Sequence, residues 1–204
     1  MRVAVGNDPP ATRGTPLYLR RPLGSGSPPE TITNRGDAPA WRAVSITGVP
    51  RADLPAESHG YAVTRHIYRP NGTEADLRDL KQTDLFVVVI KATRADASQS
   101  VQTLVIDLLP AGFEIETVTV SQGRTTTEYS WLPELTEPAY AEERDDRFIA
   151  ALDLKSGTKD FTLAYIVRAV TPGEFKYPAL VVEDMYDPET SGRTAIGKLT
   201  VSAR

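Results

Sequence analysis

Short runs of β-branched and aromatic residues, divided by proline and glycine, recur along most of the chain. The strongest runs lie at residues 61–69, 84–94, 100–109, 113–120, 148–155, 160–170, 174–184 and 195–203. Most of them alternate apolar and polar residues, which is the period of a strand with one buried face. Sixteen prolines are spread over the whole length and argue against long helices. The pattern predicts an all-β protein, with helix only as an isolated turn at Glu74–Leu80.

Two of these runs indicate how their strands are buried. In residues 61–69, one face carries Tyr61, Val63, Arg65 and Ile67. Phe86–Ile90 is a continuous apolar run, as expected for a central strand covered on both faces. The spacing of the runs after residue 60 is that of an immunoglobulin-like or fibronectin-like antiparallel β-sandwich. Residues 121–146 are polar and irregular, with Trp131 and Tyr140 as the expected anchors onto the sandwich.

The first quarter of the chain has a weaker pattern. Its strand candidates are Val3–Val5, Leu17–Arg20, Glu30–Asn34 and Trp41–Val49. Gly24–Pro29 has the composition of a flexible linker, and residues 50–59 form a polar connection. We therefore expect residues 1–56 to be an additional N-terminal β segment and residues 57–204 to be the sandwich.

Composition narrows the classes of function. The formal net charge of −4 disfavours nucleic acid and anionic membrane as partners. The chain has no cysteine, which excludes disulfides, thiolate metal sites and a cysteine nucleophile within it. No apolar run reaches the length of a membrane span, and the first ten residues lack the apolar core of a secretory leader.

The residues that could carry catalysis are not arranged for it. The two histidines, His59 and His66, fall on a connection and on the polar face of a strand. Glu183 and Asp184 are adjacent on a strand end, so their carboxylates point to opposite faces and cannot work as a facing pair. The sequence also lacks a nucleophile elbow, a paired-histidine metal motif and a phosphate loop. We expect a non-catalytic protein with no cofactor and no metal.

Two short motifs each have two interpretations. The acidic stretch Glu142–Arg147 suggests a calcium or acid–base site, but its two arginines favour loop charges that pair with one another. Arg35-Gly36-Asp37 suggests cell adhesion. It is also ordinary hairpin-turn chemistry after Asn34, with glycine supplying a positive φ.

The segment that stands out is Leu180–Thr194, an apolar run that breaks at acids and then places Met185 and Tyr186 where a loop begins. Loop tips usually carry small polar residues, because large apolar groups stay in water there. Two interpretations follow. Either the pair folds back onto its own domain, or it contacts something outside this chain.

Four blocks, in this order and spacing, resemble the C-terminal end of the bacterial alpha-2-macroglobulins. They are Asp107–Glu116, Glu143–Phe148, Tyr165–Gly173, and Val182–Tyr186 with Gly192–Thr194. Residues 32–34, 44–50 and 80–85 fit the same family, so the resemblance covers nearly the whole chain.

The resemblance implies a part in a protease trap. In this family a protease cuts a bait segment, the molecule rearranges, and an internal Cys–Gln thioester captures the protease. The last macroglobulin-like sandwich packs on the thioester domain and covers the thioester, and the match places the covering Met-Tyr pair at Met185 and Tyr186. Residues 1–56 would then be the tail of a preceding CUB-like domain. Because bait, thioester domain and cysteine are all missing, we expect a C-terminal fragment.

The resemblance also implies partners and a location. The partners are the thioester domain of the same polypeptide, target proteases and, for some members, a peptidoglycan glycosyltransferase. The implied location is the periplasm, with the parent protein lipid-anchored to the inner membrane. The alternative from a different class is a free-standing Ig-like adhesion or scaffold module of the bacterial surface or periplasm.

Overall fold

The computed structural model describes residues 2–12, 14, 16–22, 31–48, 52–117 and 129–204. Every regular element in those ranges is a β-strand, which confirms the all-β prediction. The chain divides into two compact units, Met1–Val49 and Pro50–Arg204. The expected division near residue 57 and the assignment of residues 1–56 to a preceding CUB-like domain stay predictions.

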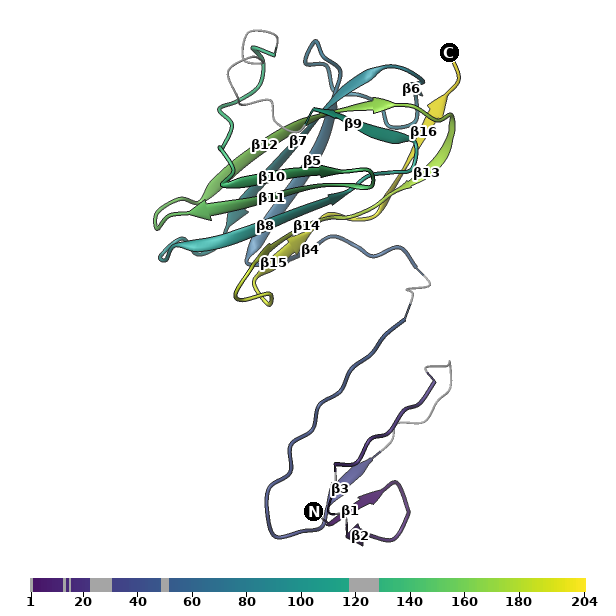
Figure 1. The fold of residues 1–204 in the computed structure, drawn as a ribbon, viewed down its shortest axis with the longest axis vertical. Coiled ribbons are helices and arrows are strands. Elements are labelled where there is room, and N and C mark those ends of the chain that lie inside the picture. The colour runs from purple at the N-terminus through teal and green to yellow at the C-terminus, as the bar shows by residue number, and fades with distance from the viewer. Residues whose placement is uncertain (1, 13, 15, 23–30, 49–51, 118–128) are drawn as a thin grey trace. The chain divides into compact units, whose positions relative to one another are not determined.

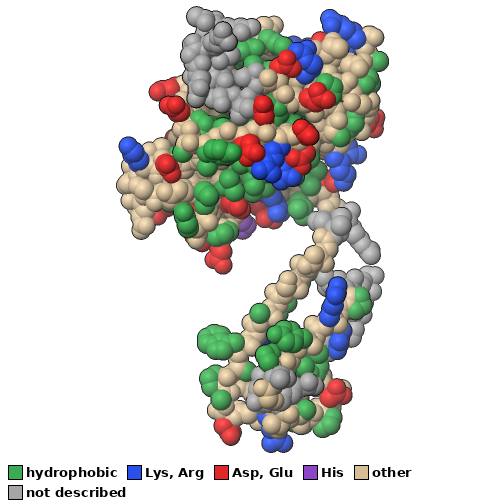
Figure 2. Space-filling view, viewed as in Figure 1, with side chains coloured by type: hydrophobic (Ala, Val, Ile, Leu, Met, Phe, Trp, Pro, Cys, Tyr) green, Lys and Arg blue, Asp and Glu red, His purple; other side chains and the backbone are tan. Residues whose placement is uncertain are grey.

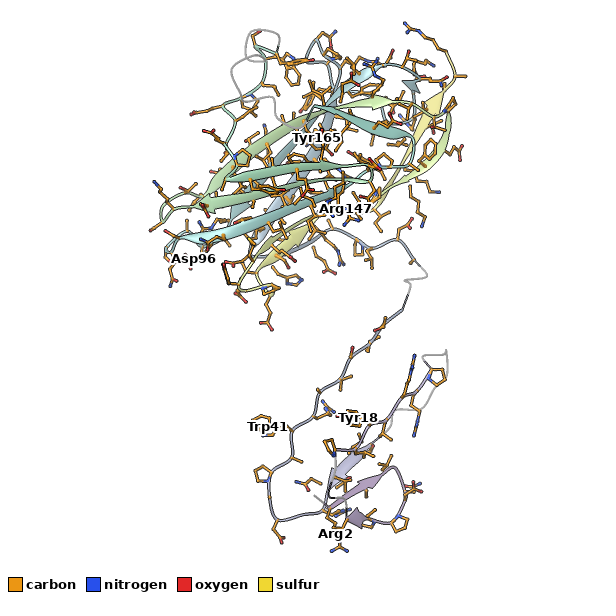
Figure 3. All side chains as sticks on the ribbon, in the orientation of Figure 1. Arg2, Tyr18, Trp41, Asp96, Arg147 and Tyr165 are labelled. Carbon is orange, nitrogen blue, oxygen red and sulfur yellow. The ribbon has the colours of Figure 1, made fainter. Side chains whose placement is uncertain are left out.

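The smaller unit contains one three-stranded antiparallel sheet in the order β2-β1-β3. Its strands are β1 (Arg2–Val5), β2 (Ala11–Thr12) and β3 (Ile32–Asn34). The predicted strands at Leu17–Arg20 and Trp41–Val49 were wrong for the residues described, because 17–20 and 41–48 have no ladder partner in this part of the chain. Trp41 is 100% exposed, and Figure 3 shows its ring pointing away from the backbone.

The Arg35-Gly36-Asp37 motif forms the expected exposed turn, but the turn does not use a positive φ at Gly36. Asn34 Oδ1 accepts a hydrogen bond from the Gly36 N–H at 3.0 Å, and Asn34 Nδ2 donates to the Ala38 carbonyl at 2.8 Å. Gly36 is not in the positive-φ region. The asparagine side chain therefore makes this turn, and the glycine's conformational freedom is not used.

The larger unit is the predicted antiparallel sandwich (Figure 1). A six-stranded sheet in the order β10-β11-β8-β14-β15-β4 packs on a four-stranded sheet, β5-β7-β12-β9, and β13-β16-β6 form a third, smaller sheet. The strands are β4 (Glu57–His59), β5 (Tyr61–Tyr68), β6 (Leu80–Lys81), β7 (Leu85–Arg94), β8 (Val101–Leu108), β9 (Phe113–Thr117), β10 (Tyr140–Arg144), β11 (Arg147–Leu154), β12 (Asp160–Ala169), β13 (Gly173–Tyr177), β14 (Leu180–Asp184), β15 (Ser191–Arg193) and β16 (Gly197–Ser202).

Two predicted elements of this unit were wrong. The strand expected over residues 174–184 divides around Pro178 into β13 and β14, which belong to different sheets, because proline cannot donate to the ladder. The expected helical turn at Glu74–Leu80 is a non-helical turn. There the Asp76 carboxylate accepts a hydrogen bond from the Arg78 N–H at 2.9 Å, which competes with helical pairing.

The prediction that the apolar run Phe86–Ile90 is buried on both faces is confirmed. Phe86–Ile90 lies within β7 and every side chain in it is buried. Alternate residues face the inter-sheet core and an outer cluster. A strap without regular structure covers that outer face with Tyr129, Trp131, Leu132 and Leu135.

One of the two predicted anchors of that strap is correct. Trp131 packs on Tyr68, with ring centroids 5.0 Å apart, and its indole N–H donates to the Pro70 carbonyl at 2.9 Å. The prediction that Tyr140 anchors the strap was wrong, because its ring is exposed at the start of β10. Tyr129, which the sequence pattern did not single out, is buried in its place.

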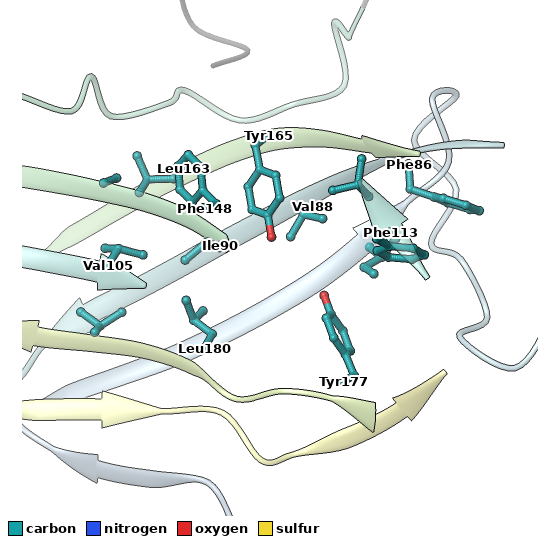
Figure 4. Close-up of a cluster of buried hydrophobic side chains, with 14 of the residues drawn as sticks. Phe86, Val88, Ile90, Val105, Phe113, Phe148, Leu163, Tyr165, Tyr177 and Leu180 are labelled. Carbon is teal, nitrogen blue, oxygen red and sulfur yellow. The ribbon is translucent and has the colours of Figure 1, made fainter. Parts of the chain in front are cut away.

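A buried ion pair joins the two main sheets. Arg65 of β5 pairs with Asp107 of β8, and both side chains are almost fully buried. The second Asp107 oxygen accepts a hydrogen bond from the Tyr165 hydroxyl at 2.7 Å. The Arg65 guanidinium also donates to the Pro178 carbonyl at 2.7 Å and lies 3.4 Å from the centroid of the Tyr177 ring. Figure 4 shows the Tyr165 and Tyr177 hydroxyls pointing into the space between the sheets.

The ionisable groups of this cluster are perturbed by their surroundings. Burial raises the pKa of the Asp107 carboxyl, and Arg65 and the hydrogen bond from Tyr165 oppose that rise. Burial also raises the pKa of the Tyr165 hydroxyl. A pair of this kind is costly to desolvate, so its removal as a unit can be tolerated although the loss of one partner cannot.

Arg65→Met should therefore lower the free energy of unfolding of the chain by about 3–5 kcal/mol, because it leaves the Asp107 carboxylate buried without its cation. The double variant Arg65→Met with Asp107→Leu should recover most of that loss. Urea denaturation measures both. Arg78→Ala, which breaks an exposed ion pair, is the control and should be neutral. A single Arg65 variant as stable as the control would contradict this account.

Candidate functional site

The candidate loop, Met185–Thr190, joins β14 to β15 at one end of the six-stranded sheet. The two strands pair from Val181 opposite Arg193 to Glu183 opposite Ser191. On its other side β14 pairs with β8, with Asp184 opposite Thr103. The loop therefore leaves a strand that is fixed on both edges.

Hydrogen bonds to Asp184 fix the first half of the loop. The side chain of this residue lies at the base of the loop, and the residue is only 8% exposed. Its Oδ1 atom accepts hydrogen bonds from the Tyr186 N–H at 2.9 Å and the Asp187 N–H at 3.2 Å. The Met185 N–H donates to the Gln102 carbonyl of β8 at 2.9 Å. Three successive backbone donors of the loop are therefore satisfied.

A second set of bonds closes the loop. The Thr190 N–H donates to the Asp187 carbonyl at 2.8 Å, and the Thr190 hydroxyl donates to the Asp187 carboxylate at 2.8 Å. The Asp184 N–H donates to the Thr190 carbonyl at 3.0 Å. The loop backbone is thus held at its start by Asp184 and Gln102, and at its end by Asp187 and the Asp184 N–H.

The backbone of the loop is fixed, but its two large side chains, Met185 and Tyr186, are exposed. Tyr186 is 81% exposed and Met185 is 45% exposed. Neither belongs to the buried core clusters of the described residues. Exposure of this size does not fit the interpretation that Tyr186 packs onto its own domain.

The exit from the loop needs a glycine. A Cβ atom placed on Gly192 would lie 2.3 Å from the Tyr61 carbonyl oxygen of β5, which is well inside van der Waals contact. Gly192 therefore lets β15 lie directly against β5, a close approach that a side chain would prevent. Gly60 has a φ of +101°, in the region that favours glycine, and an added Cβ there would lie 2.8 Å from the Thr190 methyl carbon.

The other candidate residues do not form a site. His59 lies 3.5 Å from Glu57 and His66 lies 2.7 Å from Glu74, and all four side chains are substantially exposed. Glu183 and Asp184 differ in burial, as expected of neighbours on opposite faces of a strand. Within the described residues no group of three or more histidines and acids could hold a metal ion, and no helix there is long and apolar enough to span a membrane.

The acidic stretch Glu142–Arg147 forms the hairpin between β10 and β11. Arg144 pairs with Glu142 at 3.1 Å, and Arg147 pairs with Asp146 at 2.6 Å. The hydrogen bond from Arg147 lowers the pKa of the Asp146 carboxyl. The interpretation of self-paired loop charges is confirmed. Over the face of the larger unit seen in Figure 2, acidic and basic side chains are interspersed and no large field of one sign forms.

Comparison with known proteins now decides the family. The family model described as the bacterial alpha-2-macroglobulin MG10 domain matches residues 60–189, which include most of the sandwich and the loop up to Glu189. The chain belongs to the bacterial alpha-2-macroglobulin family. The resemblance stated from the sequence blocks is therefore confirmed, and the free-standing adhesion or scaffold module is not favoured.

Individual alpha-2-macroglobulins agree with this assignment. The chain is 36% identical to the Escherichia coli K12 protein over 168 residues, which are 78% of this chain and 10% of that protein. A crystal structure of Salmonella alpha-2-macroglobulin reacted with methylamine matches 76% of this chain and 10% of its own, at 32% identity and a TM-score of 0.65.

A structure of native Escherichia coli alpha-2-macroglobulin that spans domain MG7 to the C-terminus matches 76% of this chain and 25% of its own, at 30% identity and a TM-score of 0.64. The chain thus spans about a tenth of the full-length relative.

Three of the four sequence blocks that carry the resemblance to the alpha-2-macroglobulins meet in the core of the MG10-like sandwich. Asp107 of the first block accepts a hydrogen bond from Tyr165 of the third, and it lies opposite Leu180, at the start of β14. The fourth block follows on the same strand and ends in the candidate loop. Buried residues of these blocks therefore pack in the sandwich core, while Met185 and Tyr186 of the fourth block are exposed.

Gly192→Ala should lower the free energy of unfolding by about 1–3 kcal/mol, because the added methyl group must displace the Tyr61 backbone. Gly197→Ala is the matched control in β16, where the nearest atom to an added Cβ is 3.8 Å away. Thermal unfolding of the two variants tests the difference. Equal melting temperatures would show that β15 can move away from β5 without cost.

Proposed function

We propose that the larger unit is a non-catalytic cover in an alpha-2-macroglobulin-type protease inhibitor. In the parent protein it docks on the thioester domain through Met185 and Tyr186 and keeps the thioester from reacting until the bait segment is cut. The observation that carries this proposal is the exposure of both side chains on a loop whose backbone is fixed by hydrogen bonds.

The chemistry of a thioester explains why such a cover is needed. Water and small amines destroy a thioester, so it survives only where both are excluded. A phenol ring supplies a large, rigid apolar surface with a hydroxyl for a polar partner at the rim, and a thioether fills irregular gaps. Tyr186 and Met185 supply one of each. The Salmonella relative is described as reacted with methylamine, a small amine of the kind that the cover has to exclude.

The partners follow from the same proposal. The immediate partner is the thioester domain of the same polypeptide, and proteases are partners of the whole protein. The glycosyltransferase partner, the periplasmic location and the lipid anchor implied by the resemblance stay predictions. The Arg35–Asp37 turn lies in the smaller unit and has no part in the proposed cover.

In the intact parent protein, Tyr186→Gly should expose the thioester without any cleavage of the bait. Truncation of an aromatic anchor at an interface typically costs about 2 kcal/mol, so the rate of free-thiol release in methylamine should rise by roughly thirtyfold. Met185→Ala should act in the same direction and more weakly, since the ring remains.

Tyr140→Gly is the control for that experiment, because Tyr140 is another exposed tyrosine of the same unit, at the start of β10. It should leave the rate of thiol release unchanged. If Tyr186→Gly matches wild type in thiol release but greatly lowers the melting temperature, Tyr186 is a core residue and the proposal is wrong.

The 204-residue chain by itself should inhibit no protease, because it has no cysteine to form a thioester. Titration of trypsin and elastase with the purified chain measures this, with the intact parent as the positive control. Dose-dependent inhibition by the chain alone would contradict its assignment as a cover within a larger trap.

A further inference from the structure

The residue just before the loop, Asp184 at the end of β14, fixes the geometry on which the proposed cover depends. We infer that Asp184 is the positioning residue that presents Tyr186 to the thioester domain. The inference rests on the proposed function of Tyr186 and extends it to a residue that does not itself touch the thioester. It assigns to Asp184 the task of fixing the tyrosine before docking.

The need for positioning follows from the exposure of Tyr186. At 81% exposure its ring has little support from its own domain, so the direction of the side chain is set mainly by the backbone at residues 185–187. A free loop at this point would have to be ordered on docking, at an entropic cost that weakens the interface. A loop ordered in advance avoids that cost.

Asp184 supplies that order through its carboxylate. One oxygen atom accepts hydrogen bonds from the N–H groups of both Tyr186 and Asp187. Charge-assisted bonds of this kind are stronger than those between neutral groups. Asp184 is the last residue of β14, which pairs with β8. Its carboxylate therefore hydrogen-bonds the Tyr186 backbone from a fixed position in the sheet.

The choice of residue supports this assignment. Aspartate commonly closes a turn by accepting a hydrogen bond from the N–H two residues on, as Asp76 does from Arg78, but Asp76 is exposed whereas Asp184 is buried. A carboxylate that is largely removed from water is costly unless its hydrogen bonds are made. Here those bonds go to the residue that carries the exposed ring and to its successor, not to the hairpin ladder.

The neighbouring acid shows the contrast. Glu183 lies one position earlier on β14, and its side chain makes none of the hydrogen bonds that hold the loop within the described residues. Glu183→Gln therefore removes one negative charge beside the loop and leaves the hydrogen bonds to Tyr186 and Asp187 in place. It separates the hydrogen-bonding role of Asp184 from a general effect of charge.

The test uses the intact parent protein and the rate of free-thiol release in methylamine. Asp184→Ala should raise the rate by about tenfold, the effect expected from the loss of two hydrogen bonds to a carboxylate. Asp184→Asn keeps an acceptor oxygen without the charge and should raise it by about threefold or less. Glu183→Gln should match wild type.

The double variant of Asp184→Ala with Tyr186→Gly separates positioning from a merely structural role. If Asp184 acts through Tyr186, the double variant should release thiol at the rate of Tyr186→Gly alone. Amide hydrogen exchange at residues 186 and 187 should be faster in Asp184→Ala than in wild type, and near wild type in Asp184→Asn.

Three results have distinct meanings. If Tyr186→Gly raises the rate and Asp184→Ala does not, the positioning inference is overturned and the proposed cover stands. If the two effects multiply in the double variant, Asp184 supports the fold and does not act through the tyrosine, which also overturns it. If Tyr186→Gly itself has no effect, the proposed function fails, and the inference that rests on it fails with it.

Discussion

One ion pair, in a place where charge is costly, fixes the alignment of the two main sheets of the sandwich. Arg65 and Asp107 connect the two main sheets through the core, and Tyr165, Tyr177 and the Pro178 carbonyl supply the contacts that the buried guanidinium and carboxylate require. A hydrophobic core would hold the sheets together in many alignments, because apolar packing has little direction. A polar contact between fixed positions on β5 and β8 is made in one alignment of the sheets, and Tyr165 and Tyr177 contact the pair in that alignment.

The same contact bears on the functional loop through β14. The Arg65 guanidinium binds the Pro178 carbonyl two residues before this strand begins, and Asp107 pairs with Leu180 at its first position. Asp184 is the fifth and last residue of this strand and has its own set of hydrogen bonds. A short strand fixed by polar groups at both ends has little freedom to shift its register. β14 therefore connects the ion pair in the core, at one end, with the hydrogen bonds that hold the Tyr186 backbone, at the other.

Sequence patterns predicted the parts of the fold that depend on periodicity and missed those that depend on partners. The alternation in β5 and β8, and the apolar run in β7, were predicted correctly because burial repeats along a strand. β12 also alternates in sequence, but both of its faces are buried from Leu163 to Val167. Trp41–Val49 alternates just as well, yet it is no strand where described, since pairing requires a second strand that a local pattern does not reveal. Asp107 was noted only as part of a family block, because its partner is 42 residues away. Met185 and Tyr186 were found because large apolar side chains are unusual in a loop. Asp184 was considered only as half of a catalytic pair and set aside, because a sequence pattern does not show its hydrogen bonds to the loop backbone.

The full exposure of Trp41 also has a spectroscopic consequence. The chain has two tryptophans, one in each compact unit: Trp41 is completely open to solvent, while Trp131 packs against Tyr68 with its N–H bonded to Pro70. An indole in water emits at longer wavelength than one packed against apolar groups, so the fluorescence of the two units is separable in the unmodified chain. Any domain of the parent protein that covers Trp41 would shift only the long-wavelength component of the emission. Docking of such a domain could therefore be followed without an added label.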